Sequence, residues 1–242
     1  MRKTIYVATL LGILASCKQK TEPQQAESKP IEIPAWQIDL DTIVERNNPK
    51  SLDLSKHQLF IDTTRNSEFY SKLISWEPQN EKNDVMDFYR NTLSKNKTLN
   101  EIDLQNFPTL WTTIRKLNGE FILYQRCDGI DKRIEITKNA IYFYGPLESH
   151  ADAINQLIRL SDEDIKIELK AKRQNGEKNA MFSITKTEHE NIYYLQYYSE
   201  NGLFQELIIP TNKASEFDLI VNNCVQMKRT EFKGFDRIEY NE

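Results

Sequence analysis

The feature that most constrains this chain is a strict alternation of apolar and charged side chains over residues 164–172. The apolar set comprises Ile165, Ile167, Leu169 and Ala171. The intervening set is charged and comprises Asp164, Lys166, Glu168, Lys170 and Lys172. A period of two puts these sets on opposite faces of a β-strand, so the pattern predicts a sheet with one dry and one solvated face.

Other runs of β type lie on both sides of this strand. We predict strands at residues 121–127, 133–137, 141–144, 180–187, 192–199 and 203–209. Asn175-Gly176 and Asn201-Gly202 have the composition of hairpin turns, and Pro210 ends the run. Residues 151–160 suit a helix or a strand by their periodicity, and we interpret them as a strand.

A meander of seven or eight such strands must either leave two exposed edges or close on itself. We predict closure, and therefore an α+β protein, mainly antiparallel β, built around an up-and-down barrel preceded by short helices. The alternative is an open or two-layer antiparallel sheet packed with helices. The strand rhythm over residues 111–210 resembles that of lipocalin-like and calycin-like barrels, which implies the same barrel fold here.

Residues 36–118 are predicted to form a helical lead-in, interrupted by a short strand at residues 58–62. Two short amphipathic helices are expected, one at residues 69–74 behind a cap at Asn66 or Ser67, and one at residues 85–93.

A third helix is expected at residues 108–117, where Pro108 fits a first helical position and Trp111 lies in the apolar stripe. Asn118-Gly119 would stop this helix. The β meander then takes residues 119–210, and the tail of residues 211–242 is expected to pack on the outside of the domain.

The first sixteen residues have the organisation of a signal peptide. Arg2 and Lys3 precede an apolar run that ends at Leu14, which is shorter than the roughly 20 residues needed to span a bilayer. Leu14-Ala15-Ser16-Cys17 resembles the lipobox of bacterial lipoproteins. The resemblance implies cleavage before Cys17, a diacylglycerol on its sulfur and an acylated new N-terminus, hence a membrane contact through lipid.

Lys18 follows the cysteine, and in lipoproteins of the enterobacterial type this resembles an outer-membrane address. We therefore expect a cell-envelope protein anchored in the outer membrane. Residues 17–35 are rich in Gln, Lys, Glu and Pro, too polar to fold, and are predicted to be a flexible tether. Residues 36–242 are then expected to form a single globular domain.

Two further cysteines, Cys127 and Cys224, remain after Cys17. In a compartment outside the cytoplasm they either form a disulfide or are both buried thiols, and the sequence leaves both alternatives open.

Charge and motifs exclude several function classes. The chain has 32 basic and 36 acidic residues, a net charge of −4 with mixed signs throughout, which argues against nucleic-acid binding. It has seven glycines and lacks a Gly-x-Ser-x-Gly, a His-Glu-x-x-His or a phosphate-binding glycine-rich loop. His57, His150 and His189 are scattered singly, so we predict no catalytic residues, no metal site and no cofactor.

Tyrosines are concentrated on the predicted strands. Tyr142, Tyr144, Tyr193 and Tyr197 could form an exposed recognition surface, or pair across strands for stability. The resulting hypothesis is a non-enzymatic binding module for a small apolar molecule or an envelope partner. The alternative is a protein-facing inhibitor or immunity-type lipoprotein, and an envelope enzyme comes third. The sequence does not define an oligomeric state.

Overall fold

The structure is a computed structural model that describes residues 44–46, 58–76, 100–127, 131–145, 149–173, 176–224 and 231–239. All of them belong to one compact unit, Asp39–Glu242. The signal sequence, Cys17 and the tether lie outside the described residues. Within the described residues no helix has the length and apolar character needed to cross a membrane.

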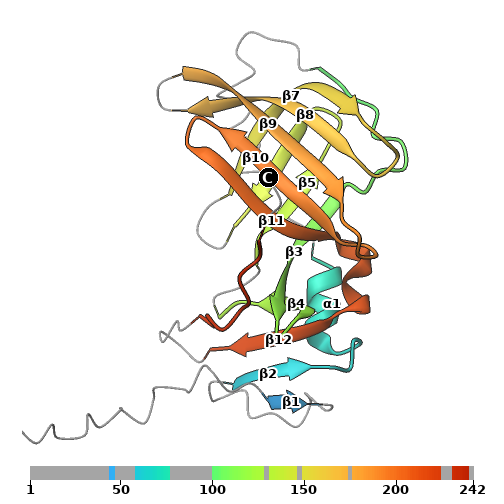
Figure 1. The fold of residues 1–242 in the computed structure, drawn as a ribbon, viewed down its shortest axis with the longest axis vertical. Helices are drawn as coiled ribbons and strands as arrows, with labels where there is room; N and C mark the ends of the chain where they lie inside the picture. The colour runs from blue at the N-terminus through green and yellow to red at the C-terminus, as the bar shows by residue number, and fades with distance from the viewer. Residues whose placement is uncertain are drawn as a thin grey trace, which may run out of the picture. The chain divides into compact units, whose positions relative to one another are not determined.

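Eight of the described strands form a closed antiparallel barrel (Figure 1). In barrel order they are β3 (Leu110–Leu117), β5 (Arg133–Ile136), β6 (Ala140–Tyr144), β7 (Ser149–Arg159), β8 (Ile165–Arg173), β9 (Gly176–Lys186), β10 (Tyr193–Ser199) and β11 (Gly202–Pro210). The barrel closes where β3 pairs with both β5 and β11. The prediction of a mainly antiparallel, closed barrel is confirmed.

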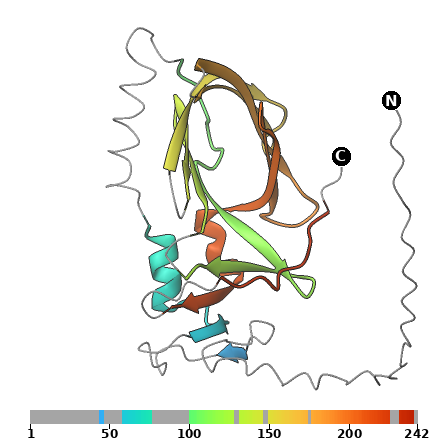
Figure 2. The ribbon, with the colours of Figure 1, turned by 90° about the vertical axis from the view of Figure 1, so that its left-hand side faces the viewer.

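A second, smaller sheet grows from the same strand β3. Its order is β1 (Val44–Arg46), β2 (Gln58–Asp62), β12 (Asp218–Asn223), β4 (Glu120–Gln125) and β3. The first half of β3 pairs with the barrel, whereas Arg115–Leu117 pairs with β4 (Figure 2). The strands β4 and β12 are parallel neighbours, so the C-terminal tail supplies a central strand of this sheet.

The helix predicted at residues 108–117 is wrong, because these residues form β3. Asn118 (φ 51°) and Gly119 (φ 86°) both have left-handed backbone, as a two-residue hairpin turn requires, and they join β3 to β4. The barrel therefore takes β3 as a member, and the strand predicted at residues 121–127 belongs to the small sheet.

Of the three expected helices, only the first is present among the described residues, as α1 (Glu68–Ile74). The Ser67 hydroxyl caps it by accepting from the backbone N–H groups of Phe69 and Tyr70. The helix predicted at residues 85–93 lies outside the described residues. A helical lead-in to the barrel is therefore not supported. The other described helix is a short 3-10 segment, η2 (Thr211–Glu216).

The two largest apolar clusters of the described residues form most of the core. One fills part of the barrel and includes Trp111, Ile167 and Phe182. The other includes Phe60 of β2, Phe69 of α1 and Leu219 of β12, and the Phe60 and Phe69 rings pack edge to face with centroids 5.9 Å apart. The second core lets α1 and one face of the small sheet bury their apolar side chains against each other, and the tail covers another cluster of the sheet that contains Ile122, Tyr124 and Phe232.

Candidate binding site

The strand register fixes which side chains face the barrel interior. Residues directly opposite each other in an antiparallel pair share a face. Ile134 lies in the barrel core opposite Phe143, and Leu195 lies in the core opposite Glu206. Phe143 and Glu206 therefore face inward as well, and so does Phe204, which is opposite Tyr197.

One end of the barrel is packed solid. Trp111 is fully buried there, with its indole N–H donating to the Pro108 carbonyl at 2.9 Å. Its ring packs against Phe107 at 5.5 Å and Tyr193 at 5.0 Å between centroids. Leu104 joins the same cluster, and its carbonyl accepts from the Arg159 guanidinium at 2.8 Å. The chain before β3 is thus tied across this end and closes it.

The other end of the barrel holds a cavity of about 640 Å³. Ile134, Phe143, Leu195, Tyr197 and Phe204 line it from β5, β6, β10 and β11. A cavity of this size is within the range of sites for small molecules, which are concave and largely apolar with a few placed polar groups. The barrel interior is therefore a packed core at one end and a lined cavity at the other.

Aromatic rings form the deep wall of this cavity. The Phe143 ring stacks on His150, with centroids 4.6 Å apart, and meets the Tyr197 ring edge to face at 5.4 Å. Behind it lies Phe182, 6.0 Å from Phe143. Such edge-to-face contacts fix ring positions, so the wall is preformed.

A carboxylate lies within the barrel beside this wall. Asp152 is opposite Ile141, which belongs to the core, and is only 1% exposed. The Tyr197 hydroxyl donates to Asp152 Oδ2 at 2.8 Å. The pair positions the Tyr197 ring that lines the cavity.

An ion pair stands at the mouth. Lys132 Nζ lies 2.5 Å from Glu206 Oε1 and 4.1 Å from the centroid of the Phe204 ring. Burial raises the pKa of the Glu206 carboxyl, and the Lys132 ammonium opposes that shift. The mouth therefore presents one cation and one anion beside an apolar interior.

The rim of the cavity is apolar on the β10–β11 hairpin. Tyr198 and Leu203 are opposite each other on the outer face, and Phe204 is on the inner face. All three are among the exposed large hydrophobic residues of the protein. The hairpin thus presents apolar side chains on both faces at its tip, beside the ion pair at the mouth.

Of the two alternatives for the tyrosines, the exposed recognition surface is wrong, because the structure buries all four at 9% exposure or less. Tyr193 and Tyr197 face the barrel interior. Tyr142 and Tyr144 lie on the outer wall, where Trp76 packs on Tyr144 and the Tyr144 hydroxyl donates to Glu135 at 3.0 Å. Tyr142 and Tyr144 therefore pack on the outer wall, whereas Tyr197 lines the cavity.

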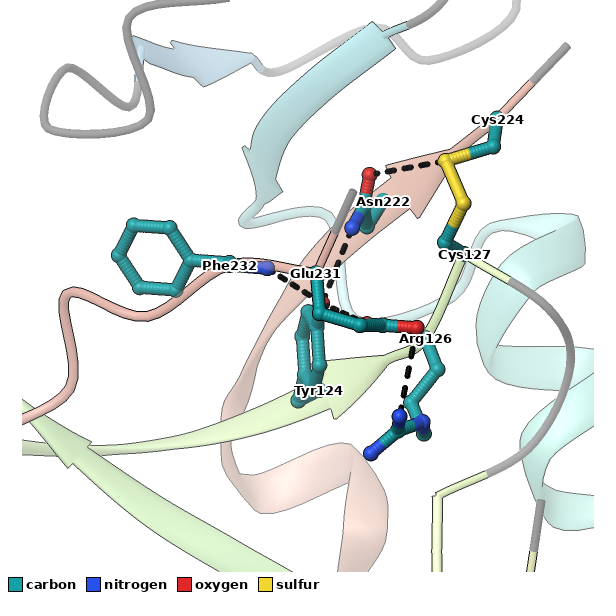
Figure 3. The surroundings of a disulfide bond; sticks show 7 residues. All are labelled: Tyr124, Arg126, Cys127, Asn222, Cys224, Glu231 and Phe232. Carbon is teal, nitrogen blue, oxygen red and sulfur yellow. Dashed lines mark hydrogen bonds and ion pairs between the residues drawn. A yellow bond between two sulfur atoms is a disulfide. The ribbon is translucent and has the colours of Figure 1, made fainter. Parts of the chain in front are cut away.

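Cys127 and Cys224 form a disulfide in the small sheet, beside a buried polar network (Figure 3). The Tyr124 hydroxyl donates to Glu231 at 2.5 Å and accepts from the Asn222 amide and the Phe232 N–H, each at 3.0 Å. Burial, then the hydrogen bond to Glu231, raise the pKa of Tyr124 to about 12. This network anchors the C-terminal tail and stands apart from the barrel cavity.

Metal-ligating side chains are not gathered in the described ranges, where no group of three or more His, Cys, Asp and Glu side chains could hold an ion. His150 stacks on Phe143, and His189 stands beside Glu188 and the Phe121 ring. His57 lies outside these ranges.

Sequence reasoning missed Asp152, Lys132 and Glu206. A signal for two of them existed, because Asp152 lies between Ala151 and Ala153 and Glu206 directly precedes the apolar run Leu207-Ile208-Ile209. A carboxylate at such a position must either face solvent or have a partner.

No protein-family model matches this chain, and no curated protein or solved structure matches it significantly.

Proposed function

We propose that this protein is a lipid-anchored binding module of the bacterial cell envelope, which holds a small apolar molecule in the open end of its barrel. The observation that carries the proposal is the cavity of about 640 Å³ within the barrel wall, walled by Phe143, Leu195 and Tyr197. A preformed apolar cavity with a few polar groups is the usual form of a small-molecule site.

The barrel also supports the finer resemblance to lipocalin-like proteins. It has eight antiparallel strands, one closed end and a cavity at the other end. Barrels of eight strands are wide enough to hold one small ligand. The small sheet that continues from β3 is an addition to such a barrel.

The polar groups at the mouth indicate the form of the ligand. Lys132 and Glu206 can bind polar atoms at one end of a molecule whose apolar body contacts Phe143 and Leu195. The ligand we propose is an amphiphile with a small polar end. No catalytic motif accompanies the cavity, so we propose binding without turnover. The protein-facing alternative depended on the tyrosine surface, and its burial removes that support.

The lipid anchor is supported by Leu14-Ala15-Ser16-Cys17 and by the polar tether after it. Changing Cys17→Ser should leave an unprocessed or soluble protein, whereas the wild type should fractionate with outer membranes. A Cys17→Ser protein that stays in the membrane fraction at wild-type mass would refute the anchor.

The cavity is tested with the apolar fluorophore N-phenyl-1-naphthylamine, whose emission rises on transfer from water to an apolar site. Wild-type protein should give saturable binding. Ser199 lines the mouth, so Ser199→Trp should fill the entrance and weaken binding by about tenfold or more, as expected for loss of roughly 1.4 kcal/mol.

Glu200→Trp is the matched control, because it adds the same ring at the next position, which does not line the cavity. It should bind the probe as the wild type does. Absence of saturable binding to the wild type, or equal binding by Ser199→Trp, would contradict the proposed site.

A further inference from the structure

Arg133 is a buried cation on the outer face of β5. It stands opposite Tyr144, away from the barrel core, and is only 3% exposed. Its Nη1 donates to the Leu73 carbonyl of α1 at 2.7 Å, and its guanidinium lies 4.9 Å from the Trp76 ring centroid. Its Nε is buried and has no hydrogen-bond partner in the described structure.

No carboxylate of the described residues forms an ion pair with Arg133. The negative charge of Asp131 raises the pKa of Arg133. Both Asp131 oxygens, however, accept hydrogen bonds from Arg115 at 2.9 to 3.2 Å. Arg126 lies 3.9 Å from the same carboxylate. Asp131 is thus shared by other cations. Burial lowers the pKa of Arg133 to about 10, against the opposing effect of Asp131.

A cavity of about 210 Å³ adjoins this guanidinium. It lies between α1 and strands β3 to β5 and is lined by Leu73, Arg133, Asp131 and the hydroxyl-bearing Thr112 and Thr113. Lys72 also lines it and is exposed to solvent, so a second cation stands at the entrance. A volume of this size accommodates a small ion with part of its hydration.

We propose that this cavity is a binding site for a small oxyanion, a phosphate or carboxylate group, with Arg133 as the main ligand and Lys72 at the entrance. A buried charge without a counter-ion is costly, and an oxyanion would neutralise it. The planar guanidinium can bind two oxygens of one anion at once. Such charge-assisted hydrogen bonds are stronger than hydrogen bonds between neutral groups. Thr112 offers a hydroxyl donor, whereas the Thr113 hydroxyl donates to the Lys132 carbonyl at 3.4 Å.

Asp131 does not prevent anion binding, because its charge is already compensated. The charged side chains that line the cavity are Lys72, Arg133 and Asp131, and Asp131 is paired with Arg115, which is outside the lining. The lining therefore carries one more cation than anion, although the chain as a whole is acidic.

The site is tested by thermal unfolding of the full-length protein in increasing inorganic phosphate, with sodium chloride keeping the ionic strength constant. The wild-type Tm should rise and saturate, because an ion that binds only the folded state stabilises it. Arg133→Met should weaken the apparent phosphate affinity at least about tenfold, since charged hydrogen bonds are lost. Lys72→Met should weaken it less.

Arg133 also borders the barrel cavity, so the location of the anion needs its own control. Lys132→Met removes a neighbouring cation, which precedes β5 and pairs with Glu206 at the mouth of the barrel cavity, and this variant should keep the phosphate response. Arg133→Lys keeps the positive charge but lacks the planar guanidinium, so it should bind phosphate with intermediate affinity. This variant replaces Arg133→Met in the test if Arg133→Met does not fold.

Repeating the titration with acetate shows which anionic group the site prefers. A larger rise in Tm with acetate than with phosphate indicates a carboxylate, and a larger rise with phosphate indicates a phosphate group. The proposal is overturned if the wild-type Tm responds to neither anion. It is also overturned if Lys132→Met, rather than Arg133→Met and Arg133→Lys, loses the response. Neither result depends on whether an apolar molecule binds in the barrel.

Discussion

Cys127 and Cys224 join the ends of two parallel neighbouring strands, β4 and β12, with their Cα atoms 5.0 Å apart. The two residues are 97 positions apart in the chain, and the segment between them contains β5 to β11, seven of the eight barrel strands. The disulfide thus closes a loop that includes nearly the whole barrel. It also fixes the tail strand β12 beside β4.

Replacing both cysteines by alanine should lower the free energy of unfolding by about 2–5 kcal/mol, because a long loop is released in the unfolded chain. Chemical denaturation of the double variant and the wild type measures this loss. Alkylation followed by mass measurement provides the check on the bond itself. Native protein should incorporate no label at these positions before reduction, and labelling of both without reductant would contradict the disulfide.

The Tyr124 network beside the disulfide predicts a pH dependence. The pKa of Tyr124 is raised from 10 to about 12 in the folded protein, so the folded state keeps this proton more tightly than the unfolded chain. The neutral hydroxyl therefore contributes stability that is fully present below pH 10 and is lost as pH rises through 12. The full contribution is about 3 kcal/mol, from a shift of about two pKa units.

Tyr124→Phe removes this ionisation together with three hydrogen bonds, and should cost about 1–3 kcal/mol at neutral pH. The stability gap between the wild type and Tyr124→Phe should then shrink between pH 10 and 12. Denaturant midpoints across this range measure the gap. A gap that stays constant would show that the Tyr124 pKa is not raised.

Local patterning predicted most of the barrel because each strand pairs with the next along the chain. The alternation at residues 164–172 places Ile165, Ile167 and Leu169 inside, as the structure confirms. The predicted hairpin between β10 and β11 is present, but Ser199 pairs with Gly202, so its two turn residues are Glu200 and Asn201. Even the ambiguous residues 151–160 form part of a strand, β7. Strands that pair with the next strand along the chain are joined by short turns, so local sequence patterns can predict them.

The small sheet could not be predicted in the same way. Its neighbours β2, β12 and β4 come from distant parts of the chain, and a parallel pair such as β12 and β4 has no connecting turn to mark it. The cavities are also products of this assembly. Arg133 and Asp152 become buried charges only when α1 and the closed barrel enclose them, which no local pattern records.

The turn at Asn118-Gly119 explains the main error in the sequence prediction. Asn-Gly between two apolar runs is a strong hairpin signal, and the branched residues Thr112, Thr113 and Ile114 also favour a strand. The turn is held by the tail, since Asp236 accepts from the N–H groups of Asn118 at 3.1 Å and Gly119 at 2.7 Å.

Gly119→Ala should therefore destabilise the protein by about 1–2 kcal/mol, because φ is +86° and an added Cβ is strained there. No atom lies within 4 Å of that Cβ, so the cost is conformational and not a clash. Asn118→Gly is the control and should change stability by under about 0.5 kcal/mol, since glycine adopts φ near +51° freely. Urea midpoints compare the variants.

The barrel core gives the last prediction, which separates inward from outward positions on β8. Ile167 is fully buried in the barrel core, whereas its neighbour Lys166 is exposed. Ile167→Asp should cost more than about 3 kcal/mol, because it buries a carboxylate without a partner. Lys166→Asp should change stability by under about 0.5 kcal/mol.

Ile167→Ala distinguishes packed core from cavity wall on the same strand. Ile167 belongs to the packed cluster with Ile165 and Phe182 and stands opposite Phe182 of β9, so its truncation should cost about 2–5 kcal/mol. Binding of N-phenyl-1-naphthylamine by the folded variant should stay at the wild-type level. Thermal melts of the three variants test the arrangement. Equal losses from Lys166→Asp and Ile167→Asp would contradict the strand orientation, and a small loss from Ile167→Ala with weaker probe binding would place the cavity deeper in the barrel.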